Sequence, residues 1–195
     1  MNDLLREQNM VPDVVRFETR PANIEGKGRI TQRQLLATAL RMRPDRILLG
    51  EARGPEALDM LQAMSTGVEG SMTTIHANSP QDAFARMETM VMMAKLELPS
   101  RFIRQQMASN IQLVVQTARL PDGTRKIVQV SEVLGLERMD LQLQDIFLFE
   151  RSGVADGGRV LGRFRGAGVQ PHFLERLRLQ GIRLSPKLFE ENTPV

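Results

Sequence analysis

The stretch Arg41–Pro80 reads RMRPDRILLGEARGPEALDMLQAMSTGVEGSMTTIHANSP, and it decides the fold. An apolar run at 47–49 leads to Glu51, a helix-like segment follows, and a strand-prone run at 72–75 ends in His76. This order predicts a parallel strand, helix and strand. The carboxyl ends of parallel strands share one edge of a sheet, where ligands bind in open α/β folds. We therefore expect Glu51 and His76 to converge on one crevice.

The segments beside this unit predict helices that flank the sheet. Thr31 followed by Gln34 forms a capping box, and the apolar positions after it predict a helix that ends before Pro44. A short strand is predicted at 14–17, and a loop rich in Gly and Arg lies between it and the helix. Further helix starts are predicted at Gly54-Pro55, Ser79-Pro80 and Pro99-Ser100, the last with Phe102, Ile103 and Met107 facing inward.

The second half of the chain predicts a small antiparallel meander. Strand patterns at 113–117, 126–133 and 141–149 surround a strong turn signal at Pro121-Asp122-Gly123. Residues 151–158 predict a loop or linker, and a strand at 160–165 and a helix at 170–180 follow it. The predicted organisation is a ragged N-terminus over 1–13, an α/β domain over 14–150 and a tail over 151–195.

Composition excludes several classes of protein. The 195 residues contain no Cys, which excludes disulfides and thiolate metal sites, and only two His, which makes a protein metal site improbable. No apolar run approaches the roughly 20 residues that cross a bilayer, and no signal-peptide core is present, so a cytoplasmic protein is the default expectation. Eight of the nine basic side chains within 16–53 are Arg, the residue suited to phosphate. Nucleic acid is one interpretation, although few aromatic residues are present to stack bases. Nucleotide phosphates and a solvated surface are the other two.

Each residue of the candidate site, taken alone, has a structural interpretation as well as a functional one. Glu51 alone is more simply a surface residue at a strand end, and His76 alone a capping residue. At one sheet edge, beside Arg-rich loops, they favour a shared anion site in which Glu51 polarises a water. A group of arginines is positioned in sequence to neutralise a triphosphate or to act as arginine fingers across a subunit boundary, although each alone is more often solvated. These are Arg16, Arg20, Arg29, Arg33, Arg41, Arg43 and Arg53.

Several long segments resemble one family. RMRPDRILLGEARGPEA at 41–57 and GSMTTIHANSP at 70–80 resemble the secretion ATPase superfamily of type II and type IV systems. VVRFETRPANIEGKGRITQRQLLATAL at 14–40 and GRFRGAGVQPHFLERLRLQGI at 162–182 resemble its tight-adherence (CpaF-type) branch of pilus-assembly ATPases. The resemblance implies an incomplete RecA-like P-loop NTPase core, with a parallel sheet and flanking helices, plus small antiparallel strands and a C-terminal α/β tail.

The resemblance also implies roles for the site residues. Gly50-Glu51 matches the family's Walker B motif, with Glu51 as the catalytic glutamate, although the Asp that usually precedes it is absent. His76 matches the histidine box, which senses the γ-phosphate side of the nucleotide. The seven arginines resemble the clamp and finger region. The implied cofactors are ATP and Mg²⁺, the metal being held through the nucleotide near Gly50-Glu51.

The family implies a cytoplasmic hexameric ring that couples ATP hydrolysis to assembly or secretion. Such a motor attaches peripherally to the inner membrane through a platform protein of the pilus or secretion apparatus, and nucleic acid is not an expected partner.

Two departures from the family pattern qualify this expectation. The Walker A pattern occurs nowhere in the chain, and Gly26-Lys27-Gly28 does not satisfy it. The family's acidic Asp box is matched only by the weak segment 2–8. The chain is therefore expected to be the C-terminal portion of the motor, with defective catalysis when isolated, because phosphoryl transfer depends on positioned phosphate contacts. The alternative is a non-enzymatic interaction module, from a truncated or split gene, that joins a full-length ring.

Overall fold

A computed structural model describes residues 13–191, so most of the predicted ragged N-terminus and the weak match to the acidic box lie outside the described residues. The chain divides into two compact units, one ending at Pro44 and the other beginning at Asp45. Each is described by itself. No helix within residues 13–191 is both long enough and apolar enough to cross a membrane.

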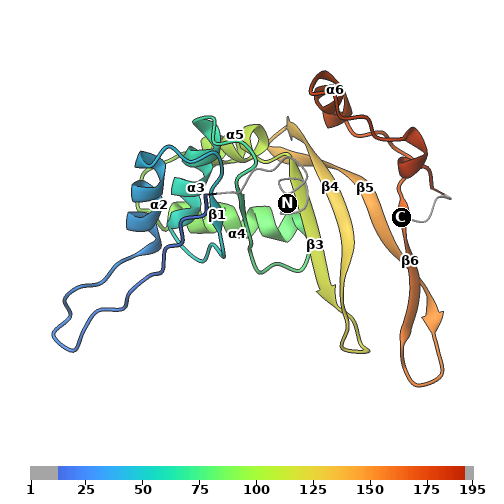
Figure 1. Ribbon diagram of the computed structural model, residues 1–195, viewed down its shortest axis with the longest axis horizontal. Helices are drawn as coiled ribbons and strands as arrows, with labels where there is room; N and C mark the ends of the chain where they lie inside the picture. Colours follow the sequence, from blue (N-terminus) through green and yellow to red (C-terminus); the bar gives the residue numbers. More distant parts are fainter. Residues whose placement is uncertain (1–12, 192–195) are drawn as a thin grey trace. The chain divides into compact units, whose positions relative to one another are not determined.

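The first unit consists of an extended arm and one helix. The arm folds back on itself through an antiparallel bridge between Arg20 and Ile30, as the hairpin-like excursion at the start of the coloured chain in Figure 1 shows. At its tip the Asn23 side chain accepts hydrogen bonds from the backbone N–H groups of Glu25 and Lys27. The predicted strand at 14–17 is wrong, because no described segment pairs with these residues, and Val14 and Val15 are exposed.

Helix α2 (Gln32–Arg41) follows the arm and begins as predicted. The Thr31 side chain accepts a hydrogen bond from the backbone N–H of Gln34, and the Gln34 side chain accepts one from the backbone N–H of Thr31. This reciprocal capping box fixes the start of the helix.

The second unit opens with the predicted strand, helix and strand. β1 (Leu48–Leu49) pairs in parallel with β2 (Met72–Thr73), and α3 (Glu56–Ser65) joins them. The apolar run at 47–49 is typical of a parallel strand that is buried on both faces, but this interpretation is wrong here, since Leu48 is 58% exposed. Its register partner Met72 is 53% exposed. The sheet formed by the described residues has two strands, and this register pair of apolar side chains is exposed.

Two helices follow and supply most of the core. α4 (Pro80–Met92) starts as predicted, with the Ser79 hydroxyl accepting a hydrogen bond from the backbone N–H of Asp82 and Pro at the first helical position. In α5 (Ser100–Asn110) the predicted inward residues Ile103 and Met107 are buried, whereas Phe102 is 47% exposed. The side chains that form this core come from α3, α4 and α5 and from the loop after β1, and the following residues are buried together: Ala52, Ala57, Leu58, Leu61, Phe84, Met87, Met90, Val91, Ile103 and Met107.

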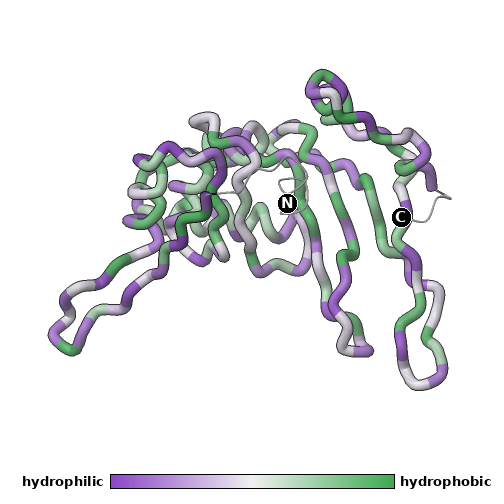
Figure 2. The backbone as a smooth tube through the Cα atoms, in the orientation of Figure 1, coloured by the Kyte–Doolittle hydropathy of each residue, from purple (hydrophilic) through white to green (hydrophobic). Residues whose placement is uncertain are grey.

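The meander is larger than predicted. β3 (Leu113–Arg119), β4 (Arg125–Glu137), β5 (Asp140–Val154) and β6 (Val160–Gly166) form one antiparallel sheet in chain order, as the arrows in Figure 1 show. Figure 2 shows both polar and apolar colours along these strands. Exposed and half-buried residues alternate along β3, which is typical of a sheet with two different faces. The expected loop or linker at 151–158 is wrong over its first half, because β5 continues through Val154 and pairs with β6.

The turn of the first hairpin is tied to the start of the last strand. Asp122 accepts hydrogen bonds from the hydroxyl and backbone N–H of Thr124, and its other carboxylate oxygen accepts one from the backbone N–H of Val160 at 2.8 Å. These bonds favour the ionised form and lower the pKa of Asp122 to about 2. A single carboxylate thus joins two hairpins that are separate in sequence.

The tail packs on the same sheet through α6 (Phe173–Leu179) and the 3₁₀ turn η1 (Pro186–Phe189). Phe189 stacks on Phe147, with ring centroids 5.5 Å apart, and is buried beside Ile146 and Leu174. Gly166 lies directly under this segment, since a Cβ atom there would come within 2.5 Å of the Phe189 backbone. The predicted helix and closing segment of the tail are therefore part of one packed layer.

Candidate functional site

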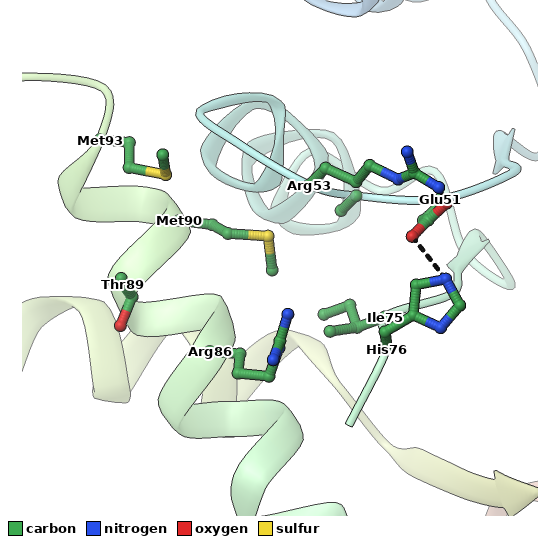
Figure 3. A pocket seen from close by; sticks show the side chains of 9 residues that line it. Glu51, Arg53, Ile75, His76, Arg86, Thr89, Met90 and Met93 are labelled. Carbon is green, nitrogen blue, oxygen red and sulfur yellow. Dashed lines mark ion pairs between the residues drawn. The ribbon is translucent and has the colours of Figure 1, made fainter. Parts of the chain in front are cut away.

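The predicted meeting of Glu51 and His76 is confirmed. Each follows a strand of the small parallel sheet, and one oxygen of the Glu51 carboxylate lies 3.0 Å from His76 Nε2. The other oxygen lies 2.7 Å from a terminal nitrogen of Arg53. Figure 3 shows the dashed Glu51–His76 contact, with Arg53 reaching the same carboxylate from the neighbouring loop. The functional roles of the two residues stay predictions.

Charge and exposure differ across this triad. The Glu51 side chain is only 21% exposed, whereas those of Arg53 and His76 are 75% and 80% exposed. The hydrogen bond from Arg53, helped by its charge and that of His76, holds the pKa of the Glu51 carboxyl below its ordinary value. Glu51 therefore remains an ionised acceptor at neutral pH. Since His76 Nε2 faces Glu51, Nδ1 is the ring nitrogen left to meet a ligand.

Two hydrogen bonds hold the ends of the two strands beside each other. The backbone N–H of Ala52 donates to the carbonyl of Thr74 at 3.0 Å, and the Thr74 hydroxyl donates to the carbonyl of Gly50 at 2.7 Å. These bonds continue the parallel pairing past the last residues of β1 and β2. The side chains of Glu51 and His76 are thus presented from a tied pair of chain segments rather than from free loops.

The loop that carries the triad is braced by Glu56. This residue lies at the first position of α3, is only 6% exposed, and accepts hydrogen bonds from the backbone N–H groups of Arg53 at 2.7 Å and Gly54 at 2.8 Å. A buried carboxylate that accepts two backbone donors is a strong constraint on a loop. Glu56 thereby sets the path of the chain from which Arg53 reaches Glu51.

The triad opens onto a cleft of about 460 Å³. Its floor and far wall come from the strand end at Ile75 and from one face of α4, where Arg86, Thr89, Met90 and Met93 recur at helical spacing. Figure 3 shows the Arg86 side chain directed into this space from α4. The cleft therefore combines one carboxylate, several cations and an apolar wall, a composition that suits an anionic ligand.

The structure separates the seven candidate arginines. Only Arg53 lies in the unit that holds Glu51 and His76, and it contacts Glu51 directly. The other six belong to the unit that ends at Pro44, where the Nε of Arg20 donates to the carbonyl of Gly28 within the arm. Their proposed action as clamp or fingers stays a prediction. The six are Arg16, Arg20, Arg29, Arg33, Arg41 and Arg43.

Sequence reasoning missed two residues of this site. Glu56 is an acidic residue in the first turn of a predicted helix, which is a recognisable cap signal, but its burial against the loop depends on tertiary packing. Arg86 lies within the helix predicted to start at Ser79-Pro80, and nothing local distinguishes it from other surface arginines. Both are found only once α3 and α4 are placed beside the strand ends.

No cluster of three or more His, Asp or Glu side chains within residues 13–191 is arranged to hold a metal ion. Glu51 is also the sole acidic residue lining the cleft among them. A divalent cation in this cleft would therefore depend on oxygen ligands supplied by a bound anion.

Comparison with known protein families matches residues 13–156 to the family described as "Type II/IV secretion system protein". Among curated proteins, a Mycobacterium tuberculosis protein assigned provisionally to conjugal transfer is 42% identical over 120 residues, which are 62% of this chain and 34% of that protein. The type IV secretion system protein VirB11 of Brucella suis is 36% identical over 120 residues, covering 60% of this chain and 33% of that protein. The conjugal transfer protein TrbB of Rhizobium radiobacter is 36% identical over 104 residues, covering 53% and 30%.

A solved structure is also similar. The VirB11 ATPase of the Brucella suis type IV secretion system, crystallised in complex with sulphate, aligns with a TM-score of 0.50 and 37% sequence identity. The alignment covers 53% of this chain and 32% of that chain. The chain thus spans about a third of the length of the relatives it matches.

Proposed function

Because the chain belongs to the type II/IV secretion system protein family, we propose that it forms the Walker B and histidine-box portion of a secretion or pilus-assembly motor ATPase. The observation that carries the proposal is the placement of Glu51 between Arg53 and His76 at the ends of two adjacent parallel strands. This is the edge of a parallel sheet where phosphate-bearing ligands bind. The VirB11 structure, which holds a sulphate, supports a tetrahedral anion as the kind of ligand.

In this proposal Glu51 orients the attacking water. Its depressed pKa keeps it ionised, and its contacts with Arg53 and His76 fix the direction of its oxygens. A carboxylate held in this way is suited to positioning a water in line with a phosphoryl group. In this proposal His76 contacts the terminal phosphate through Nδ1. Its Nε2 contacts Glu51, so the position of Glu51 responds to whether that phosphate is bound. Arg53 has one contact to Glu51 and is exposed enough to exchange it for a phosphate oxygen.

ATP and Mg²⁺ are the proposed cofactors of the complete motor. The cleft residues fit an anion better than a bare metal, since Glu51 is the only carboxylate lining the cleft among residues 13–191. Mg²⁺ would therefore be held near Gly50-Glu51 mainly through the nucleotide, with Glu51 as the nearest carboxylate of this chain. When bound it neutralises charge on the phosphates, while Glu51, Arg53 and His76 position the water and the terminal phosphate.

The architecture and partners of the parent motor are part of the same proposal. We place this chain in a RecA-like core and a hexameric ring, with the arginines at 16–43 contacting nucleotide within or between subunits. The tight-adherence branch of pilus-assembly motors is the proposed subfamily. The motor is proposed to lie in the cytoplasm and to bind a platform protein of the inner membrane. The resemblance of 14–40 and 162–182 to that branch supports this assignment.

A second function is favoured by two specific observations. The Walker A pattern is missing from these 195 residues, and the backbone N–H groups and Lys of that loop normally hold the β- and γ-phosphates. The side chains of Leu48 and Met72, paired in the parallel sheet, are also exposed to solvent. Both features suit a non-enzymatic module that joins a full-length ring or is completed by another polypeptide.

Complementation separates the two functions. The chain is co-expressed with a phosphate-loop portion of a related secretion ATPase, and hydrolysis of ATP by the purified complex is measured. The motor proposal expects no turnover by the chain alone, turnover by the complex, and its loss in Glu51→Gln, with Glu97→Gln as an exposed control on another loop. A complex that assembles without hydrolysing ATP supports the interaction module. Turnover unchanged by Glu51→Gln overturns the role of Glu51.

A further inference from the structure

The cleft contains a cation that the proposed mechanism does not use. Arg86 lines it from α4, on the same helical face as Thr89, Met90 and Met93, and Figure 3 shows its side chain directed inward. Within residues 13–191 it makes no hydrogen bond or ion pair. The hydroxyl of its neighbour Thr89 already has a hydrogen-bond acceptor, since it donates to the carbonyl of Ala85 at 3.0 Å.

A comparison with Arg104 shows why this matters. Arg104 lies on α5 and is engaged on several sides, donating to the Glu88 carboxylate at 3.0 Å and to the carbonyl of Met139 at 2.7 Å. That arginine is part of the packing between α4, α5 and the sheet. Arg86, two residues before Glu88 on the same helix, has no such role among the described residues, although it points at a concave surface.

The charges around the cleft are unbalanced. The Glu51 carboxylate is already matched by Arg53 at 2.7 Å and contacted by His76 at 3.0 Å. Arg86 is therefore an additional positive charge facing the triad, and the wall formed by Ile75, Met90 and Met93 supplies no counter-charge. Ionic hydrogen bonds strengthen beside apolar surface, where water competes less. An anion that enters the cleft has basic groups on two sides.

We infer that Arg86 is an anion-binding residue that grips a pyrophosphate group from the side opposite Glu51, Arg53 and His76. A guanidinium offers two parallel N–H donors to two phosphoryl oxygens, a geometry that a Lys ammonium does not reproduce. The identity of the pyrophosphate as the end of a nucleotide rests on the proposed function. The anion site itself rests on the cleft, its lining charges and the unpaired guanidinium.

The test uses the full chain and inorganic pyrophosphate as the probe, titrated by calorimetry and by the NMR signals of the His76 ring. Wild type is expected to bind with a Kd in the millimolar range or tighter and to shift the His76 signals. Arg86→Gln is expected to weaken binding tenfold or more, and Arg86→Lys by a smaller factor because the charge remains. Arg101→Gln, at an exposed position of α5, is the matched control and is expected to change the Kd less than twofold.

Two results overturn the inference: no binding of pyrophosphate to the wild type, or equal affinity for wild type and Arg86→Gln. Circular dichroism checks that each variant keeps its helices, and the Lys variant retains a long basic side chain if the Gln variant is perturbed. A second titration with ATP distinguishes free pyrophosphate from a nucleotide as the natural source of the anion. Failure of the complementation assay while Arg86-dependent binding persists removes the motor ATPase but leaves the anion site.

Discussion

Glu132 and His172, 40 residues apart in sequence, meet through two contacts: the backbone N–H of His172 donates to one carboxylate oxygen at 2.9 Å, and His172 Nδ1 lies 3.1 Å from the same oxygen. The other oxygen accepts from the backbone N–H of Phe173 at 3.0 Å. Glu132 is only 5% exposed. The tail is thus attached to β4 by a buried carboxylate as well as by apolar packing.

Replacing Glu132 by Ala is expected to lower the free energy of unfolding by about 2–3 kcal/mol, because two backbone N–H groups lose their shared side-chain acceptor in a buried place. Amide hydrogen exchange should rise over 170–191, while the core helices α4 and α5 remain protected. Glu137→Ala, at the exposed end of the same strand, is the control and should change stability little. Unchanged exchange in the tail of Glu132→Ala contradicts the prediction.

Glu56→Ala is expected to cost about 2 kcal/mol of stability and to loosen the loop that carries Arg53. The reason is that Arg53 and Gly54 lose the shared acceptor of their backbone N–H groups. Glu56→Gln keeps an amide oxygen in the same place and serves as the matched control. Thermal unfolding measures the stability, and amide exchange at 53 and 54 measures the loop. Equal protection in the Ala and Gln variants counts against this bracing role.

The pH dependence of the triad follows from the lowered pKa of Glu51. Because the folded value lies below the ordinary 4.5, stabilisation by the Arg53 pair is present above pH 4.5 and is lost as the pH falls through the folded value. Arg53→Gln removes the leading cause and should move the titration of Glu51 upward. Carboxyl carbon NMR shifts report this midpoint, with Arg101→Gln as control. The idea fails if Glu51 titrates at the same pH in Arg53→Gln and wild type.

Gly166→Ala is expected to displace the segment at 186–191 and to destabilise the chain by about 1–3 kcal/mol, the usual cost of overpacking. The added Cβ would lie 2.5 Å from the backbone carbonyl of Phe189, and a backbone neighbour cannot rotate away as a side chain does. Gly50→Ala is the control, since its Cβ would meet no atom within 4 Å. Thermal unfolding of the two variants measures the difference, and equal melting temperatures would refute the packing argument.

Local signals predicted local structure well. The capping box at Thr31, the cap at Ser79 and the turn at Asp122 each depend on a few neighbouring residues, and each is found as expected. The meeting of Glu51 and His76 was also predictable, because parallel strands end at one edge.

What the sequence did not predict depends on distant partners. Hydropathy at Leu48 and Phe102 says nothing about which layer covers them, and both are exposed. The predicted linker began at Arg151, yet β5 continues through Val154, with an irregularity in its pairing between Arg151 and Gly153. Only residues 155–159 form the connection to β6. Glu56 and Arg86 became candidates only when α3 and α4 were seen beside the strand ends.

The bond from Asp122 to Val160 has a mechanical consequence. β6 pairs on only one side, with β5, and its far end at Val160 is tied to the turn of the β3–β4 hairpin. A pulling force applied at the C-terminus would unzip β6 from Gly166 toward Val160, one ladder pair after another. The last interaction to break is the hydrogen bond from Val160 to Asp122, which belongs to the β3–β4 hairpin. The force therefore passes to β3 and β4 once β6 has separated. The hairpin of β3 and β4 is therefore expected to bear the tension only after β6 has separated from β5.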